Sequence, residues 1–205
     1  MADADQAVDQ GRLPDAPEAL VAIDQDDLGA ETERGAEGFD VAVLGLDLDR
    51  PASKLPWLTQ ARHHVLLVPG EAALPKRILV SVQVGEPGKA DVRFAERFAW
   101  QLGASATVMT VVPERQAKVP VHTGRFIESC ERMLGARGVV TRSKVRNGSP
   151  VDEILAEMSE GEHDLLIVGA PLPETGADLL TGALGSLFRH QPQWPILIVR
   201  HQTGT

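Results

Sequence analysis

The chain has 205 residues, of which 29 are acidic and 20 basic, and its formal net charge is −9. This length suits one domain of ~100–200 residues with room for part of a second. The negative charge argues against a nucleic-acid interface or adhesion to an anionic membrane, and no apolar run approaches the ~20 residues that a membrane-spanning helix needs. The single cysteine, Cys130, excludes an intrachain disulfide and a thiolate zinc site. These features are typical of a cytoplasmic protein.

The acidic residues are concentrated at the start of the chain. Residues 1–75 carry 15 acidic and 5 basic side chains, whereas residues 76–205 carry 14 and 15. Composition therefore divides the chain. We predict a disordered acidic tail over 1–19, a partial domain over 20–73 and a complete domain over 76–205.

Two apolar runs precede the complete domain. Residues 39–46 (FDVAVLGL) and 63–70 (HHVLLVPG) are almost continuously apolar. Strands of a parallel sheet are covered on both faces and have this pattern. Both runs are therefore predicted to be strands.

A helix follows the first strand of the complete domain. Its pattern predicts a helix over 88–104 whose apolar positions recur every four residues, at Ala90, Phe94, Phe98 and Leu102. Gly103 stands where a glycine commonly ends a helix in the left-handed conformation. Further along, Ser149 is expected to cap a helix that begins at Pro150.

The remaining segments continue the alternation of strands and helices. We predict strands over 77–84, 106–112, 139–146, 165–168 and 195–200, and helices ending at Gly135, over 150–158 and over 179–190. Strands separated by helices of this length form right-handed crossovers. The predicted fold is an α/β protein with an open, parallel, five-stranded sheet, helices on both faces, and extra strands from the partial domain.

The two halves also share a pattern that suggests a repeat. GFDVAVLGL at 38–46 aligns with EHDLLIVGA at 162–170, and HHVLLVP at 63–69 aligns with WPILIVR at 194–200. One interpretation is that the N-terminal part is a truncated copy of the later domain. Chance similarity between buried strands is the alternative.

Several of these segments together resemble the universal stress protein domain over nearly all of 77–200. They are RILVSVQV, the helix ending in LGA, TVMTVVPE, VRNGSPVDEIL, HDLLIVGA and PILIVR. The resemblance implies an ATP site in which an Asp ends the first strand, a valine after the second strand contacts adenine, and Gly-x2-Gly-x9-Gly-(Ser/Thr) wraps the ribose and phosphates.

The resemblance places these roles on particular residues of this chain, and several depart from the pattern. The Asp position falls on Gln83 and the valine on Val111. The glycines fall on Gly169, Leu172 and Gly182, and the hydroxyl falls on Ala183. A looser register would use Gly176, Gly182, Gly185 and Ser186, with Thr181 beside them. Gln83 lacks a carboxylate, and Leu172 stands between two prolines that have no N–H to donate.

These departures favour weak ATP binding or none, and a non-catalytic regulatory role in stress response. The sequence predicts neither a catalytic residue nor a metal site, because the six histidines show no ligand spacing and G-x-S-x-G is absent. We accordingly predict no cofactor, with ATP as the alternative. Other readings are an ATP-binding, slowly hydrolysing stress protein and the cytosolic regulatory domain of a membrane transporter.

The last predicted strand also bears on assembly. In the family that the chain resembles, this strand pairs antiparallel with its counterpart in a second domain, which hides an apolar edge. Here residues 64–68 offer a partner within the same chain. We predict that PILIV pairs with HVLLV, giving a pseudo-dimeric monomer. A homodimer or a separate protein partner at the last strand is the alternative.

Overall fold

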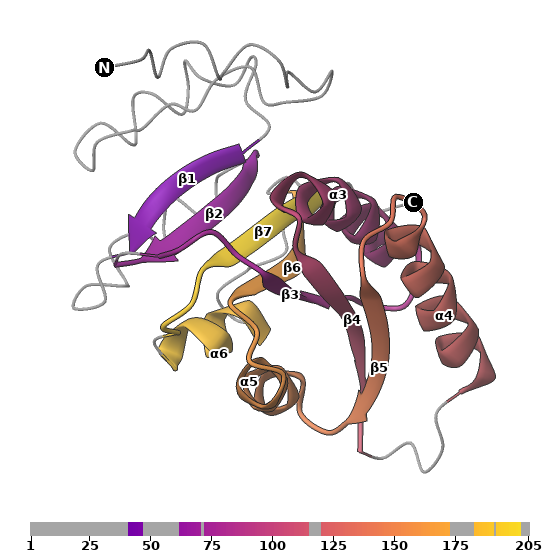
Figure 1. Cartoon of the computed structure of the whole chain (residues 1–205). Helices are drawn as coiled ribbons and strands as arrows, with labels where there is room; N and C mark the ends of the chain where they lie inside the picture. The colour runs from indigo at the N-terminus through magenta and orange to yellow at the C-terminus, as the bar shows by residue number, and fades with distance from the viewer. Residues whose placement is uncertain are drawn as a thin grey trace, which may run out of the picture.

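The computed structural model describes residues 41–46, 62–70, 72–114, 120–172, 183–190 and 192–201 (Figure 1). Its strands are β1 (Val41–Leu46), β2 (His64–Pro69), β3 (Arg77–Ser81), β4 (Ser105–Val112), β5 (Thr141–Asn147), β6 (Leu165–Pro171) and β7 (Ile196–His201). Its helices are α3 (Glu86–Leu102), α4 (Val121–Gly135), α5 (Pro150–Glu160) and α6 (Ala183–Arg189). The predicted acidic tail, 1–19, lies outside the described residues.

All described strands belong to one sheet with the order β1-β2-β7-β6-β3-β4-β5. The five strands from β7 to β5 are mutually parallel. β1 and β2 are parallel to each other, and β2 is antiparallel to β7. The predicted fold class is therefore confirmed: a parallel five-stranded sheet extended at one edge by two further strands.

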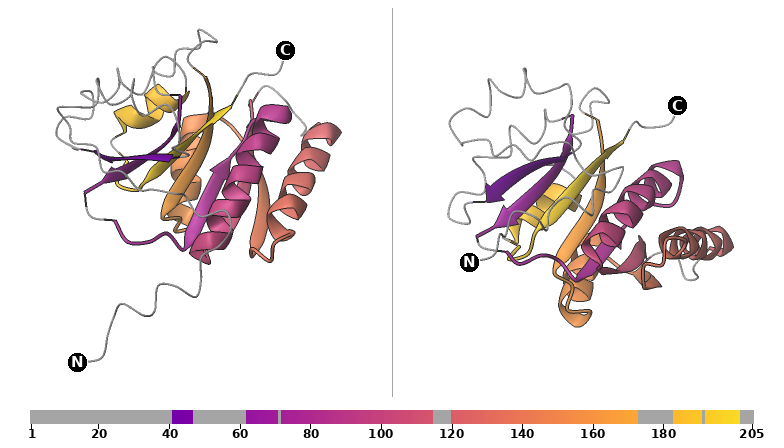
Figure 2. Two further views of the ribbon diagram at one scale, coloured as in Figure 1. Left: turned by 90° about the horizontal axis from the view of Figure 1, so that it is seen from above. Right: turned by 45° about the horizontal axis from the view of Figure 1, so that its top comes forward.

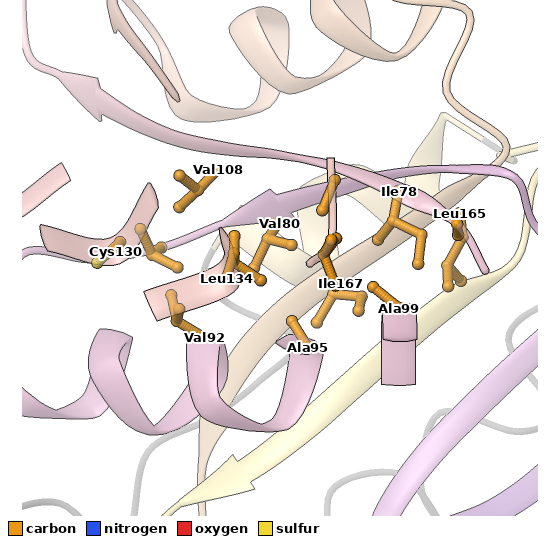
Figure 3. Packing of buried hydrophobic residues seen from close by; sticks show 14 of the residues in the cluster. Ile78, Val80, Val92, Ala95, Ala99, Val108, Cys130, Leu134, Leu165 and Ile167 are labelled. Atoms are coloured by element: carbon orange, nitrogen blue, oxygen red, sulfur yellow. The ribbon is translucent and has the colours of Figure 1, made fainter. Parts of the chain in front are cut away.

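Helices cover both faces of the sheet (Figures 1 and 2). α3 and α4 pack on one face, where the buried side chains shown in Figure 3 include Ile78, Val80, Val92, Ala95, Ala99, Val108, Cys130, Leu134, Leu165 and Ile167. α5 and α6 pack on the other face, over a second core that includes Leu79, Met109, Ile154, Met158, Leu166 and Leu187. Successive residues of β3 and β6 alternate between the two cores, as the pleat of a strand requires.

The predicted residues at the ends of α3 and α5 agree in part with the structure. Gly103 ends α3 with φ 63°, in the left-handed conformation that was predicted for it. Ser149 precedes α5 in an extended conformation, as predicted, but its side chain makes no capping hydrogen bond. Pro150 opens α5, where its missing N–H costs nothing. None of the described helices combines the length and apolarity that a membrane crossing requires.

The buried face of α3 differs from the predicted stripe. The buried residues of α3 are Gly88, Asp91, Val92, Ala95 and Ala99, which are mostly small. Phe94 and Phe98 are only partly buried, at the side of this face. Phe94 packs against His64 of β2, with ring centroids 4.3 Å apart. A large aromatic side chain thus joins α3 to the extra strands.

The antiparallel pairing of β2 with β7 was predicted from the sequence. The paired residues are Val65 with Ile198, Leu66 with Leu197, and Leu67 with Ile196. The backbone amide of Arg200 donates a hydrogen bond to Nδ1 of His64 at 2.9 Å, which extends the contact beyond the ladder. Val65 and Leu67 are fully buried, so β2 is part of the core.

The register of the extra strands matches that of the strands with which they align. Ala42 pairs with Val65, and their aligned counterparts Leu166 and Ile196 also pair. The β2–β7 ladder is symmetric about Leu66 and its aligned partner Leu197. This geometry supports the repeat interpretation, which stays a prediction.

A buried ion network fixes α5 against β5. The carboxylate of Glu157 is completely buried and accepts hydrogen bonds from Nζ of Lys144 at 2.7 Å and Nη2 of Arg146 at 2.6 Å. Nε2 of His163 lies 3.3 Å from the same carboxylate. Burial alone raises the pKa of Glu157, but these hydrogen bonds outweigh it and hold the pKa below its usual value.

Candidate functional site

A cavity of about 320 Å³ lies at the carboxyl ends of the parallel strands. β3 is flanked by β4 on one side and by β6 on the other, so the order in which the chain adds strands to the sheet reverses at β3. Open α/β sheets bind ligands at such a switch point. The lining residues are Ser81, Val82, Gln83, Val84, Pro87, Asp91, Thr110, Val111, Pro150, Ile154, Val168, Gly169, Pro171, Leu187 and His201.

The structure brings together some of the residues that the sequence proposed for a nucleotide site. Gln83, Val111 and Gly169 all line the cavity. Gly185 and Ser186 lie in α6 but are not among the lining residues, and that helix contributes Leu187 instead. Gly176, Thr181 and Gly182 lie outside the described residues.

The chain after Gly169 continues as a strand, although the sequence predicted that the strand would end at Val168. β6 runs to Pro171, which pairs with His201 of β7. The next amide, that of Leu172, donates to the carbonyl oxygen of His201 at 3.1 Å. Pro171 has no N–H to donate, and the hydrogen bond to β7 beyond it is made by the amide of Leu172. The amide at the position of the family's second glycine is therefore used within the protein.

Asp91 is an acidic residue of the cavity that the sequence analysis did not identify. Its side chain is 4% exposed, and its Oδ1 lies 3.1 Å from Nδ1 of His201. A Cβ added at Gly169 would overlap the Asp91 carboxylate, so the glycine makes room for this side chain. The available signal was an acidic residue three positions after Gly88, on the small-residue face of α3.

Asp91 is the one acidic side chain among the described lining residues of the cavity. Burial raises the pKa of Asp91 to about 6, although His201 beside it lowers the pKa. Asp91 is therefore mainly ionised near neutral pH. None of the described lining residues is a lysine or an arginine. The cavity presents a hydrogen-bond acceptor with negative charge, and among its described lining residues only the His201 side chain can carry a positive charge.

The other reactive side chains around the cavity form no catalytic arrangement within the described part of the chain. Ser81 and Thr110 line it, but neither hydroxyl is hydrogen-bonded to Asp91 or His201. Among the described residues, no group of three or more His, Cys, Asp or Glu side chains is placed to hold a metal ion. Cys130 is buried away from this site, and burial raises the pKa of its thiol to about 11.

Gly169→Ala is expected to lower the free energy of unfolding by about 1–3 kcal/mol, the usual cost of overpacking a tight site. The new methyl group would displace the Asp91 carboxylate. Asp91→Ala in the same chain should recover most of the loss, and urea unfolding measures both. Gly124→Ala is the control, because a Cβ there meets nothing within 4 Å. Equal effects at Gly124 and Gly169 would contradict the packing described here.

Asp91→Asn is expected to stabilise the protein near neutral pH and to leave it unchanged in acid. The pKa of Asp91 rises from 3.8 in a free carboxyl to about 6 in the folded protein. The folded state therefore keeps this proton over a pH range in which the unfolded state has lost it. Wild-type stability falls across this range, by roughly 3 kcal/mol in total. Asparagine has no such proton to lose.

Urea unfolding of both proteins at a series of pH values tests this expectation. The stability difference between variant and wild type should be small near pH ~4, grow up to pH ~6 and then stay level. A difference that does not change with pH would show that the Asp91 carboxyl titrates normally.

Comparisons with known proteins agree with this architecture. The sequence model of the universal stress protein family matches residues 75–200. No curated protein sequence matches the chain.

Solved structures share the fold at low sequence identity. A universal stress protein from Archaeoglobus fulgidus DSM 4304 superposes with a TM-score of 0.66 and 13% identity, over 85% of this chain and 65% of that protein. A functionally unknown protein from Pseudomonas aeruginosa PAO1 gives 0.61 and 18%, over 87% and 69%. A universal stress protein in complex with cAMP gives 0.51 and 18%, over 62% and 98%. By its matched sequence and its fold, the chain belongs to the universal stress protein family.

Proposed function

We propose that this protein is a non-catalytic regulatory member of its family that takes part in stress response and binds ATP weakly or not at all. The observation that carries the proposal is the charge of the cavity. Asp91 lines it with a buried carboxylate, and no described lining residue is a lysine or an arginine. The repulsion between a phosphate charge and a carboxylate ~4 Å away costs about 1 kcal/mol in water and about 4 kcal/mol near a protein surface.

The backbone around Gly169 supports the same proposal. Phosphate sites in α/β proteins depend on free amides at a glycine-rich turn. Here the amide of Leu172 donates to His201, and Pro171 has no N–H. Neither of these two positions supplies an amide for a phosphate.

The absence of an activated hydroxyl among the described lining residues favours a non-catalytic role. A nucleophilic serine or threonine needs a base within hydrogen-bonding distance, and Ser81 and Thr110 have none there. Because a protein with this fold was solved in complex with cAMP, ATP binding is the alternative. We assign the protein to the cytoplasm on its single cysteine, a buried free thiol.

Thermal unfolding with magnesium ATP, together with an assay of phosphate release, tests this proposal. If the dissociation constant were about a hundredth of the ATP concentration, ATP would stabilise the protein by about 2.7 kcal/mol. For a chain of this size, that corresponds to roughly 5–10 °C in Tm. We expect neither such a shift nor phosphate release above that of buffer. Either result would favour the ATP-binding alternative.

The assembly that we propose is a monomer in which β1 and β2 take the place of a second domain. β2 pairs with β7, so the edge that would be open to another chain is occupied from within. The symmetric register about Leu66 and Leu197 supports a pseudo-dimeric arrangement. The alternative is a homodimer or a separate protein partner at β7. Deletion of residues 1–75 tests the proposed assembly.

A further inference from the structure

The outer side of α3 carries two arginines that no described residue neutralises. Arg93 and Arg97 are exposed, four positions apart, and neither forms an ion pair within the described part of the chain. The two glutamates of this helix, Glu86 and Glu96, pair with other basic side chains. Like charges at i and i+4 of a helix repel each other. An acidic group bound between the two guanidiniums would therefore be favoured.

Aromatic side chains lie beside these guanidiniums. Cζ of Arg97 is 6.0 Å from the centre of the Phe94 ring, and Trp100, at the end of the same helix, is 40% exposed. Aromatic residues and arginine are enriched where proteins bind polypeptide segments, and arginine can bind a carboxylate through two parallel hydrogen bonds. The outer face of α3, which comprises Arg93, Arg97 and Trp100, therefore fits an acidic stretch of polypeptide.

The residues that precede β1 have the complementary charge and join the sheet close to α3. Residues 24–40, which lie outside the described part of the chain, contain seven acidic side chains and one basic side chain. Val41, the first residue of β1, pairs with His64, whose ring packs against Phe94 of α3. An extended chain spans ~3.3 Å per residue. The segment is therefore long enough to reach the outer face of α3.

We propose that the outer face of α3 binds the acidic segment 24–40 of the same chain. Carboxylates of the segment would pair with Arg93 and Arg97 and relieve the repulsion between them. Because the segment is joined covalently to β1, its effective concentration at this face exceeds that of a separate acidic protein. An acidic partner would have to displace the segment, so the contact would also control access to this face.

Limited trypsin digestion of the full chain tests the proposal, because Arg34 is a cleavage site within the segment and Arg12 is one outside it. Bound segment is protected, so Arg93→Gln with Arg97→Gln should raise the cleavage rate at Arg34 at least about fivefold, through loss of two surface ion pairs. The rate at Arg12 should not change. Equal rates at Arg34 in the wild type and this variant would overturn the proposal.

The matched control is Arg125→Gln with Arg142→Gln, which removes the same charge from exposed positions in α4 and β5. It should leave the rate at Arg34 unchanged. A synthetic peptide of residues 24–40, titrated calorimetrically into the full chain, distinguishes the segment from an acidic partner. We expect no binding, because the face is occupied. Peptide binding that Arg93→Gln with Arg97→Gln abolishes would show that the face is open to a separate acidic protein, and the proposed occupant would be wrong.

Discussion

Arg146→Met is expected to lower the free energy of unfolding by about 3 kcal/mol, near the lower end of the effect of breaking a buried ion pair. The reason is that the carboxylate of Glu157 is completely buried and would lose the guanidinium, which donates to it at 2.6 Å. Lys144 and His163 would remain beside the carboxylate, which limits the loss. Chemical denaturation at neutral pH measures the change.

Removing the carboxylate as well should reverse much of this loss. Replacing both members of a buried ion pair by apolar groups is often close to neutral, so Arg146→Met with Glu157→Met should be more stable than Arg146→Met alone. Arg142→Met is the matched control. Arg142 is an exposed residue of the same strand with no ion pair among the described residues, and its replacement should change stability by less than about 0.5 kcal/mol. Equal losses at the two arginines would contradict the account.

Deletion of residues 1–75 is expected to make the remaining domain dimerise or precipitate. The deletion removes β1 and β2 and leaves the backbone groups of β7 unpaired at the sheet edge. It also uncovers the neighbours of Val65 and Leu67, which are fully buried in the intact chain. A long apolar edge strand without a partner pairs readily with another chain.

Light scattering coupled to size-exclusion chromatography measures the outcome. Deletion of residues 1–40 is the control, because it keeps both strands and should leave the oligomeric state of the full chain unchanged. A well-behaved monomer after deletion of 1–75 would show that β2 is not needed to cover β7, and the proposed pseudo-dimeric assembly would be wrong.

The strands could be predicted from the sequence because strands buried on both faces are almost continuously apolar. Runs such as 63–70 and 195–200 could be assigned to strands, and their similarity suggested the antiparallel pairing that the structure confirms. The predicted apolar face of α3 was wrong because two phenylalanines dominated the pattern. The helix in fact turns its small residues to the sheet, since close packing selects for size as well as hydrophobicity.

The residues that carry the site were harder to predict, because they are polar groups within apolar surroundings. Gln83, Val111 and Gly169 followed from the family pattern, and they line the cavity. Asp91 did not, since a single carboxylate in a helix is usually exposed, and the same holds for Glu157 in the ion network between α5 and β5. Only the fold shows that His201 lies beside Asp91, 110 positions away, and that Arg146 of β5 lies beside Glu157.

Calorimetric titration of the full chain with magnesium ATP at about 25 °C shows whether this cavity excludes phosphate. We expect no measurable heat, or a dissociation constant well above the micromolar range. A dissociation constant in the low micromolar range, about −8 kcal/mol, would contradict it.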